Sequence, residues 1–133
     1  MIDRDKRRPF SLKERFHSFV YAYRGLKLLL NEHNTWIYLL AVFCVVVVGL
    51  LVSLTLVEWA VVIILLGNVW IAEALNTAVE RLCDHVTPRQ HPEIAHIKDV
   101  AAAAPLIAAM VAVVAGLCIF MPPIIEWVES LIQ

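Results

Sequence analysis

Two long apolar runs dominate the pattern of hydrophobic and polar positions along the chain. Trp36 to Leu56 is 21 residues without a charged side chain, and Val100 to Met121 is 22. At about 1.5 Å of rise per residue, a helix of either length crosses the ~30 Å hydrocarbon core of a bilayer. The pattern therefore predicts transmembrane helices over residues 36–56 and 100–121.

A third apolar run extends from Trp59 to Ala72 and is then interrupted by polar residues. So short a run is also typical of a buried helix in a soluble protein. A chain that already crosses the membrane twice favours a third crossing, so we expect a transmembrane helix over 58–80. Trp36 and Tyr38 suit the membrane interface at one side, and Trp59 and Trp127 suit the other.

An amphipathic pattern precedes the first long run. Ser11 and Glu14 have the spacing of a capping box at the start of a helix, and the apolar residues after them recur at helical spacing. We expect a surface helix over 10–30 that lies in the cytoplasmic interface of the membrane; a helix packed on a partner protein is the alternative. The apolar residues are Leu12, Phe16, Phe19, Val20, Tyr23, Leu26 and Leu30.

Composition and charge fix the class and the topology. With 61% hydrophobic and 17% charged residues, the chain is too apolar for a soluble domain of 133 residues. All 11 Lys and Arg residues lie either before Trp36 or between Arg81 and Lys98. By the positive-inside rule these segments are cytoplasmic. The prediction is an all-α membrane protein, a single domain over 1–133 with an N-terminal amphipathic surface helix and three transmembrane helices.

Polar residues form one row on the predicted 58–80 helix and its extension. Glu73, Asn76, Glu80 and Asp84 are spaced by three, four and four, so they fall within roughly 80° of arc on a helix. An ionisable side chain inside a membrane is costly unless it faces protein or water. A structural contact between helices explains one such residue, but four on one face favour a functional site.

Further polar groups lie at the same cytoplasmic level. Lys98 and Asp99 begin the last helix, and Glu32 begins the first transmembrane one. Carboxylates bind Mg²⁺ and cations bind phosphate, which predicts a phosphate-handling site at the level of the lipid headgroups. The chain has no glycine-rich phosphate loop, so a nucleotide must be held by metal and side chains. A zinc site at His85, His91 and His96 is the less favoured interpretation, because their spacing is irregular.

At these residues the sequence resembles the bacterial diacylglycerol kinase and undecaprenol kinase family of small three-span membrane enzymes. The most specific segments are E-x-L-N-T-A-x-E-x-x-x-D over 73–84 and K-D-x-A-A from Lys98. Segments 21–27, 31–34 and 57–60 add to the resemblance, and the last two look more like the undecaprenol kinase branch. The chain departs from the family pattern at Ala103 and Pro105, where the family usually has glycine and then an apolar residue.

The resemblance implies a homotrimer in the bacterial inner membrane, with its N-terminus cytoplasmic and active sites shared between neighbouring chains. It implies that Glu73 is the general base, that Asn76 shapes the site, and that Glu32 and Glu80 hold the Mg²⁺ of MgATP. The residues that it places around the nucleotide are Tyr21, Arg89, Gln90, His91, Lys98 and Asp99.

The expected function is therefore ATP-dependent phosphorylation of the hydroxyl of a membrane lipid alcohol, diacylglycerol or undecaprenol, with no role for nucleic acid. The alternative is a small oligomeric membrane carrier or a non-catalytic scaffold, in which Glu73 is an intramembrane proton site. The cations and Asp99 near the cytoplasmic loop have no task in a proton carrier, and they suit a nucleotide.

Overall fold

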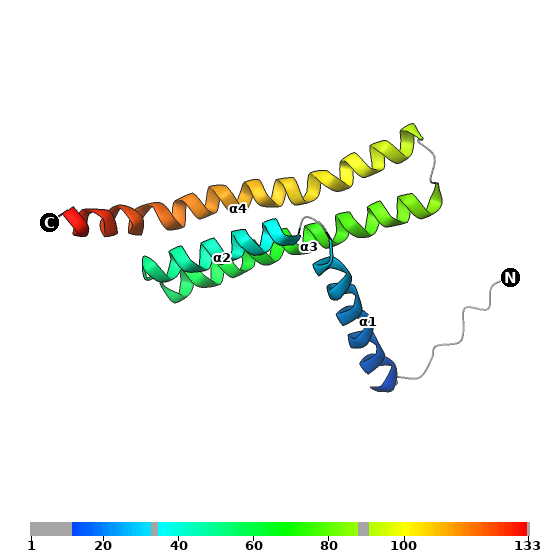
Figure 1. Cartoon of the computed structure of the whole chain (residues 1–133), viewed down its shortest axis with the longest axis horizontal. Helices are drawn as coiled ribbons and strands as arrows, with labels where there is room; N and C mark the ends of the chain where they lie inside the picture. The colour runs from blue at the N-terminus through cyan, green and yellow to red at the C-terminus, as the bar shows by residue number, and fades with distance from the viewer. Residues whose placement is uncertain (1–11, 33–34, 88–90, 133) are drawn as a thin grey trace. The chain divides into compact units, whose positions relative to one another are not determined.

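The computed structural model describes residues 12–32, 35–87 and 91–132. This part of the chain forms four helices and no strand: α1 (Leu12–Leu30), α2 (Thr35–Leu51), α3 (Leu56–Val86) and α4 (Pro92–Ile132). They belong to two compact units, residues 1–35 and 36–133. Figure 1 shows the four helices along the chain.

The first unit contains α1. Glu14 lies in its first turn and Lys27 in its last, the arrangement that complements the helix dipole. The ring of Tyr21 lies 6.5 Å from that of His17, and the Arg24 guanidinium lies 6.0 Å from the Tyr21 ring. The predicted helix is present, while its expected N-cap, Ser11, lies outside the described residues. Phe16 and Phe19 are 71% and 74% exposed.

In the second unit, α2 and α3 are joined by a tight turn. Ser53 adopts a positive φ of 57°, and the Leu54 amide donates to the Gly49 carbonyl at 3.1 Å. Thr55 then caps α3 in a capping box with Glu58. The helix α2 therefore ends at Leu51, five residues before the apolar run does, because the last residues of that run form the turn.

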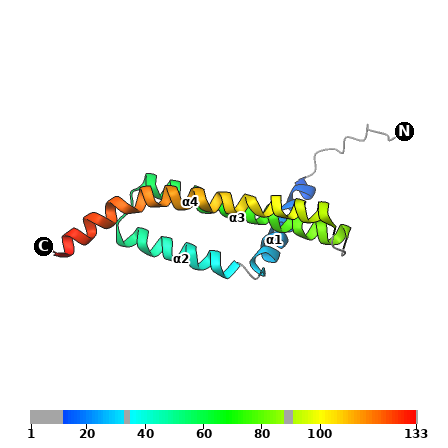
Figure 2. The same cartoon turned by 90° about the horizontal axis from the view of Figure 1, so that it is seen from above.

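The helices α3 and α4 run antiparallel, side by side (Figure 1). The buried residues of α3 recur every seven positions: Val62, Val69, Asn76 and Cys83. A repeat of seven keeps one seam of a helix against its neighbour. On α4, Pro105 and Ala108 are buried. Figure 2 shows α2 as a separate layer that joins α3 at the turn.

The helix α4 extends well beyond its apolar run at both ends. It begins at Pro92, a residue whose fixed φ and missing N–H suit the first helical position. Pro105, where the chain departs from the family pattern, lies thirteen residues inside this helix. Interior prolines are tolerated in membrane helices where neighbouring groups satisfy the freed carbonyl.

Within the residues that the structure describes, two helices, α3 and α4, are each long and apolar enough to cross a membrane. The number of spans rises to three if α1 and α2 together count as one bent span. At 17 residues, α2 is shorter than the predicted 36–56 segment. Among the described residues no large side chain is fully buried, and most large apolar side chains are exposed. An apolar outer surface of this kind fits a protein whose solvent is lipid.

Candidate active site

The polar row of α3 is held at the seam with its neighbour. Asn76 is 9% exposed and takes the place of an apolar residue in the seven-residue repeat. Glu73 and Glu80 are half-buried, whereas Asp84, nearer the end of α3, is exposed. The predicted row is therefore present, with its amide the most buried member.

Asn76 and Glu80 contact each other one turn apart. The Asn76 Nδ2 donates a hydrogen bond of 3.4 Å to Glu80 Oε1. The other amide atom, Asn76 Oδ1, is buried and has no hydrogen-bond partner in the described part of the chain. A buried acceptor without a partner is costly, so it marks a place where a ligand can supply the missing contact.

An ion pair joins the end of α3 to the beginning of α4. The Lys98 Nζ donates to Asp84 Oδ1 at 2.5 Å, with the lysine side chain 35% exposed and the aspartate 67%. This hydrogen bond raises the pKa of Lys98, which precedes the apolar run, and the nearby charge of Glu80 acts in the same direction. Lys98 therefore stays charged across the neutral pH range, beside both carboxylates.

The helix α2 contributes a residue that the sequence patterns did not place in the site. The Tyr38 ring lies 5.9 Å from that of Trp70 on α3, at an interplanar angle of 54°. Its hydroxyl lies close enough to the Glu73 carboxylate for the carboxylate charge to act on it. From the sequence, Tyr38 suited only the membrane interface. The sequence did contain one indication of this contact: Trp70 and Glu73 are about one turn apart on α3, so a ring packed on Trp70 lies near Glu73.

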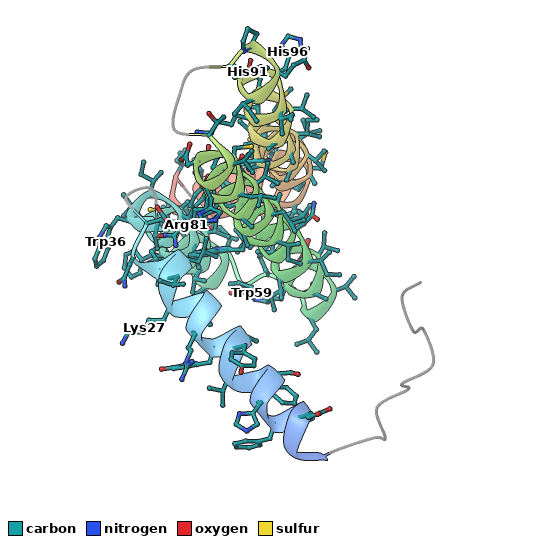
Figure 3. The ribbon with its side chains drawn as sticks, turned by 90° about the vertical axis from the view of Figure 1, so that its right-hand side faces the viewer. Lys27, Trp36, Trp59, Arg81, His91 and His96 are labelled. Atoms are coloured by element: carbon teal, nitrogen blue, oxygen red, sulfur yellow. The ribbon has the colours of Figure 1, made fainter. Side chains whose placement is uncertain are left out.

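The other predicted residues are exposed or lie elsewhere. His91 and Asp99, at the start of α4, are exposed, and Figure 3 shows His91 and His96 at that end of the helix. Arg89 and Gln90 lie outside the described residues. Tyr21 and Glu32 belong to the first unit. Tyr21 is 64% exposed, and Glu32 is half-buried.

A complete metal cage is not found within the described residues: no three His, Cys, Asp or Glu side chains gather closely enough to hold an ion. Glu80 and Asn76 nevertheless place a carboxylate and an amide oxygen on one helix face. Both are the hard oxygen ligands that Mg²⁺ takes, and Mg²⁺ at nucleotide sites usually needs only one or two protein carboxylates besides phosphate and water.

A cavity of about 500 Å³ lies among α2, α3 and α4. Its lining is almost entirely apolar and includes Val69 from the seam, Ala112 and Gly116 from α4, and the rings of Tyr38 and Trp70. Tyr38 thus borders the cavity, with the Glu73 carboxylate near its hydroxyl. The Glu73 end of the row lies one turn beyond Trp70, the last α3 residue that lines this space, and the space is suited to an apolar chain.

Residues 20–120 match the prokaryotic diacylglycerol kinase family, which is more than two thirds of the chain. The chain belongs to this family. It is a membrane lipid kinase, and this assignment decides between the enzyme and the carrier or scaffold alternatives. The row of carboxylates on α3 and the lysine at the start of α4 are then groups suited to phosphoryl transfer.

Two curated relatives agree with the family. The kinase is 37% identical over 108 residues to the undecaprenol kinase of Bacillus subtilis (strain 168), a match that covers 80% of this chain and 88% of the relative. It is 34% identical over 111 residues to a diacylglycerol kinase of Synechocystis sp., covering 82% of this chain and 63% of that relative. No solved structure matches the chain.

Proposed function

We propose that the kinase transfers the γ-phosphoryl group of ATP to the hydroxyl of a membrane lipid alcohol at the cytoplasmic face of the bacterial inner membrane. The observation that carries this is the row of Glu73, Asn76 and Glu80 on α3, in which the buried Asn76 Oδ1 lacks a hydrogen-bond partner. An apolar cavity lined by Trp70, one turn before Glu73, supports a lipid substrate. The basic residues before Trp36 and between Arg81 and Lys98 support a cytoplasmic N-terminus.

Glu73 is the proposed general base. It lies seven residues before Glu80, about 10 Å further along the helix axis. The cytoplasmic end carries the ion pair, so Glu73 lies deeper in the membrane and closer to the apolar cavity. Its carboxylate would accept the proton of the lipid hydroxyl as that oxygen bonds to phosphorus and ADP leaves.

Glu80 and Asn76 are the proposed metal ligands within the second unit, and Glu32 would add a second carboxylate from the same or a neighbouring chain. The unpaired Asn76 Oδ1 supports this, because an oxygen acceptor beside a carboxylate fits Mg²⁺. When bound, Mg²⁺ would neutralise charge on the phosphate oxygens. Asn76 also holds the Glu80 carboxylate through its Nδ2.

Lys98 is proposed to bind the phosphates of ATP. Its present partner, Asp84, is largely exposed, and exposed ion pairs contribute only about 0–1 kcal/mol. Exchange of this partner for a nucleotide phosphate is therefore inexpensive. Tyr21, Arg89, Gln90, His91 and Asp99 remain proposed nucleotide contacts from the family resemblance.

For the lipid, we propose undecaprenol ahead of diacylglycerol. The identity to the undecaprenol kinase is the higher of the two, and that match covers more of the relative's length. The cavity among α2, α3 and α4 supports a long apolar substrate of either kind.

Purified kinase in detergent, with radiolabelled ATP and each lipid alcohol in turn, tests this function. We expect phosphorylation of undecaprenol to exceed that of diacylglycerol. In the same assay, Glu73→Gln should reduce kcat by about 10²–10⁴-fold, as for a missing general base, and leave the KM for ATP largely intact. Near-normal turnover by Glu73→Gln would contradict the assigned base, and phosphorylation of diacylglycerol alone would contradict the substrate.

A further inference from the structure

Tyr38 meets Glu73 across the α2–α3 packing. Tyr38 lies in the first turn of α2, and its ring is fixed at 5.9 Å from Trp70. Trp70 and Glu73 are three residues apart, so they are neighbours on one face of α3. A tyrosine that rests its ring near the tryptophan can extend its hydroxyl one turn further, to the carboxylate, and the two groups do interact.

The position of Tyr38 is unusual for an aromatic residue at the start of a membrane helix. Trp36, two residues earlier, is 75% exposed and points outward in Figure 3, as expected of an interfacial anchor. Tyr38 is instead only partly exposed and lines the apolar cavity. Its hydroxyl would be costly beside an apolar space without a partner, and the carboxylate of Glu73 is the polar group near it.

We propose that Tyr38 is a positioning residue that acts through Glu73, a proposal that rests on Glu73 being the general base. The Tyr38 hydroxyl donates to one carboxylate oxygen and holds the side chain at the edge of the cavity. The second oxygen stays available to the hydroxyl of a lipid whose chain occupies that cavity.

The reaction moves one proton, from the lipid hydroxyl to Glu73, and does not change the protonation of Tyr38. The lipid oxygen bonds to the γ-phosphorus, the bond from that phosphorus to the bridging oxygen of ATP breaks, and the lipid proton moves to Glu73. Tyr38 keeps its own proton throughout. It contributes by limiting the rotamers of a glutamate side chain, which otherwise has three rotatable bonds to order before reaction.

Tyr38→Phe is the test, because phenylalanine keeps the ring beside Trp70 and removes only the hydroxyl. A hydrogen bond to a charged group is typically worth roughly a 10- to 100-fold change in an equilibrium, so we expect kcat to fall by about 10-fold or more. The KM for ATP should not change, since Tyr38 is not among the proposed nucleotide contacts. The matched control is Trp36→Phe, an aromatic change at the same end of α2, which should leave kcat unchanged.

A second measurement separates positioning from a structural role. In a Glu73→Gln background, adding Tyr38→Phe should cause no further loss of the residual turnover, because the group it positions is gone. Thermal unfolding in detergent checks that each variant remains folded. Wild-type kcat in Tyr38→Phe, or an equal fold loss in both backgrounds, would overturn the proposal while leaving the proposed function intact. Normal turnover of Glu73→Gln would instead overturn the proposed base itself, and this proposal with it.

Discussion

At the residue scale, the two glutamates of α3 differ in what surrounds them. Glu80 accepts a hydrogen bond from Asn76 and lies near Lys98, at the end of α3 where the nucleotide is proposed to bind. Glu73 lies near Tyr38, which lines the apolar cavity. If Glu80 binds the metal and Glu73 is the base, then removing the charge of each residue should reduce turnover in a different way.

We therefore expect Glu80→Gln to raise the Mg²⁺ or Mn²⁺ concentration needed for half-maximal turnover, with part of the activity returning at high metal. Glu73→Gln should not respond to metal, because it lacks a proton acceptor. Turnover measured over a metal titration checks both. Glu129→Gln, an exposed change near the far end of α4, is the control. Rescue of Glu73→Gln but not Glu80→Gln would reverse the two roles.

The spacing of residues along one helix predicted a large part of this site. Glu73, Asn76 and Glu80 share a face because each residue turns a helix by about 100°, and a short loop brings Lys98 to the end of the preceding helix, where it meets Asp84. The contact of Tyr38 with Glu73 was not predictable in this way. It depends on how α2 packs against α3, and no pattern within one helix specifies the partner of a residue on another.

At the element scale, the turn between α2 and α3 forces the two helices together. A Cβ added at Gly49 would lie 2.8 and 2.9 Å from Trp59 Cη2 and Cζ2 and 3.1 Å from a Leu54 methyl group. Trp59 lies in the first turns of α3, after the Thr55 cap. Gly49 is therefore required because the helices approach closely there, and not because its backbone adopts a conformation that favours glycine.

We expect Gly49→Ala to destabilise the fold by about 1–3 kcal/mol, the usual cost of overpacking, because the rigid indole ring has to move. Thermal unfolding in detergent measures the change. Gly67→Ala is the matched control: nothing lies within 4 Å of a Cβ at Gly67, so alanine there should be neutral or stabilise by about 0.5–1 kcal/mol. Equal melting temperatures for the two variants would contradict the packing at the turn.

Helix existence was easier to predict than helix length. Apolar runs identified α2, α3 and α4, but α2 ends inside its run and α4 extends on both sides of its run, from Pro92 to Ile132. The reason is that hydropathy predicts whether a segment is surrounded by lipid or by water. The ends of a helix depend instead on local capping groups, such as the side chain of Thr55, and on backbone hydrogen bonds.

At the scale of the whole molecule, the described chain buries little of itself, and no three metal-ligating side chains gather within it. Glu80 and Asn76 are two proposed oxygen ligands, and the proposed second carboxylate, Glu32, belongs to the other unit. In the proposed homotrimer, neighbouring chains complete each site. It remains a prediction that mixing tests directly.

Chains carrying Glu73→Gln and chains carrying Glu32→Gln, each inactive alone, should regain partial activity when they are co-assembled, because some shared sites then receive both intact residues. Turnover of the mixed preparation is compared with each parent assembled separately. If the mixed oligomers form normally and stay as inactive as their parents, the residues of each site come from one chain.

The predicted topology has its own measurement. A cysteine placed at Arg89, in a variant whose Cys44, Cys83 and Cys118 are replaced by serine, should resist an impermeant thiol reagent in intact cells and react after lysis. A cysteine at Ser53, in the turn on the opposite side, should react in intact cells and serves as the positive control. Efficient labelling at position 89 from outside would contradict a cytoplasmic loop.

Asn76 also has a consequence for how the helix pair is aligned. A single polar side chain in an otherwise apolar seam fixes the register of two helices at some cost in stability. A slide of α4 by one seven-residue repeat would carry Lys98 about 10 Å from Asp84. An apolar residue at position 76 would therefore pack more favourably and yet loosen the alignment that brings the lysine to the carboxylates. One amide links the stability of the α3–α4 pair to its competence as an enzyme.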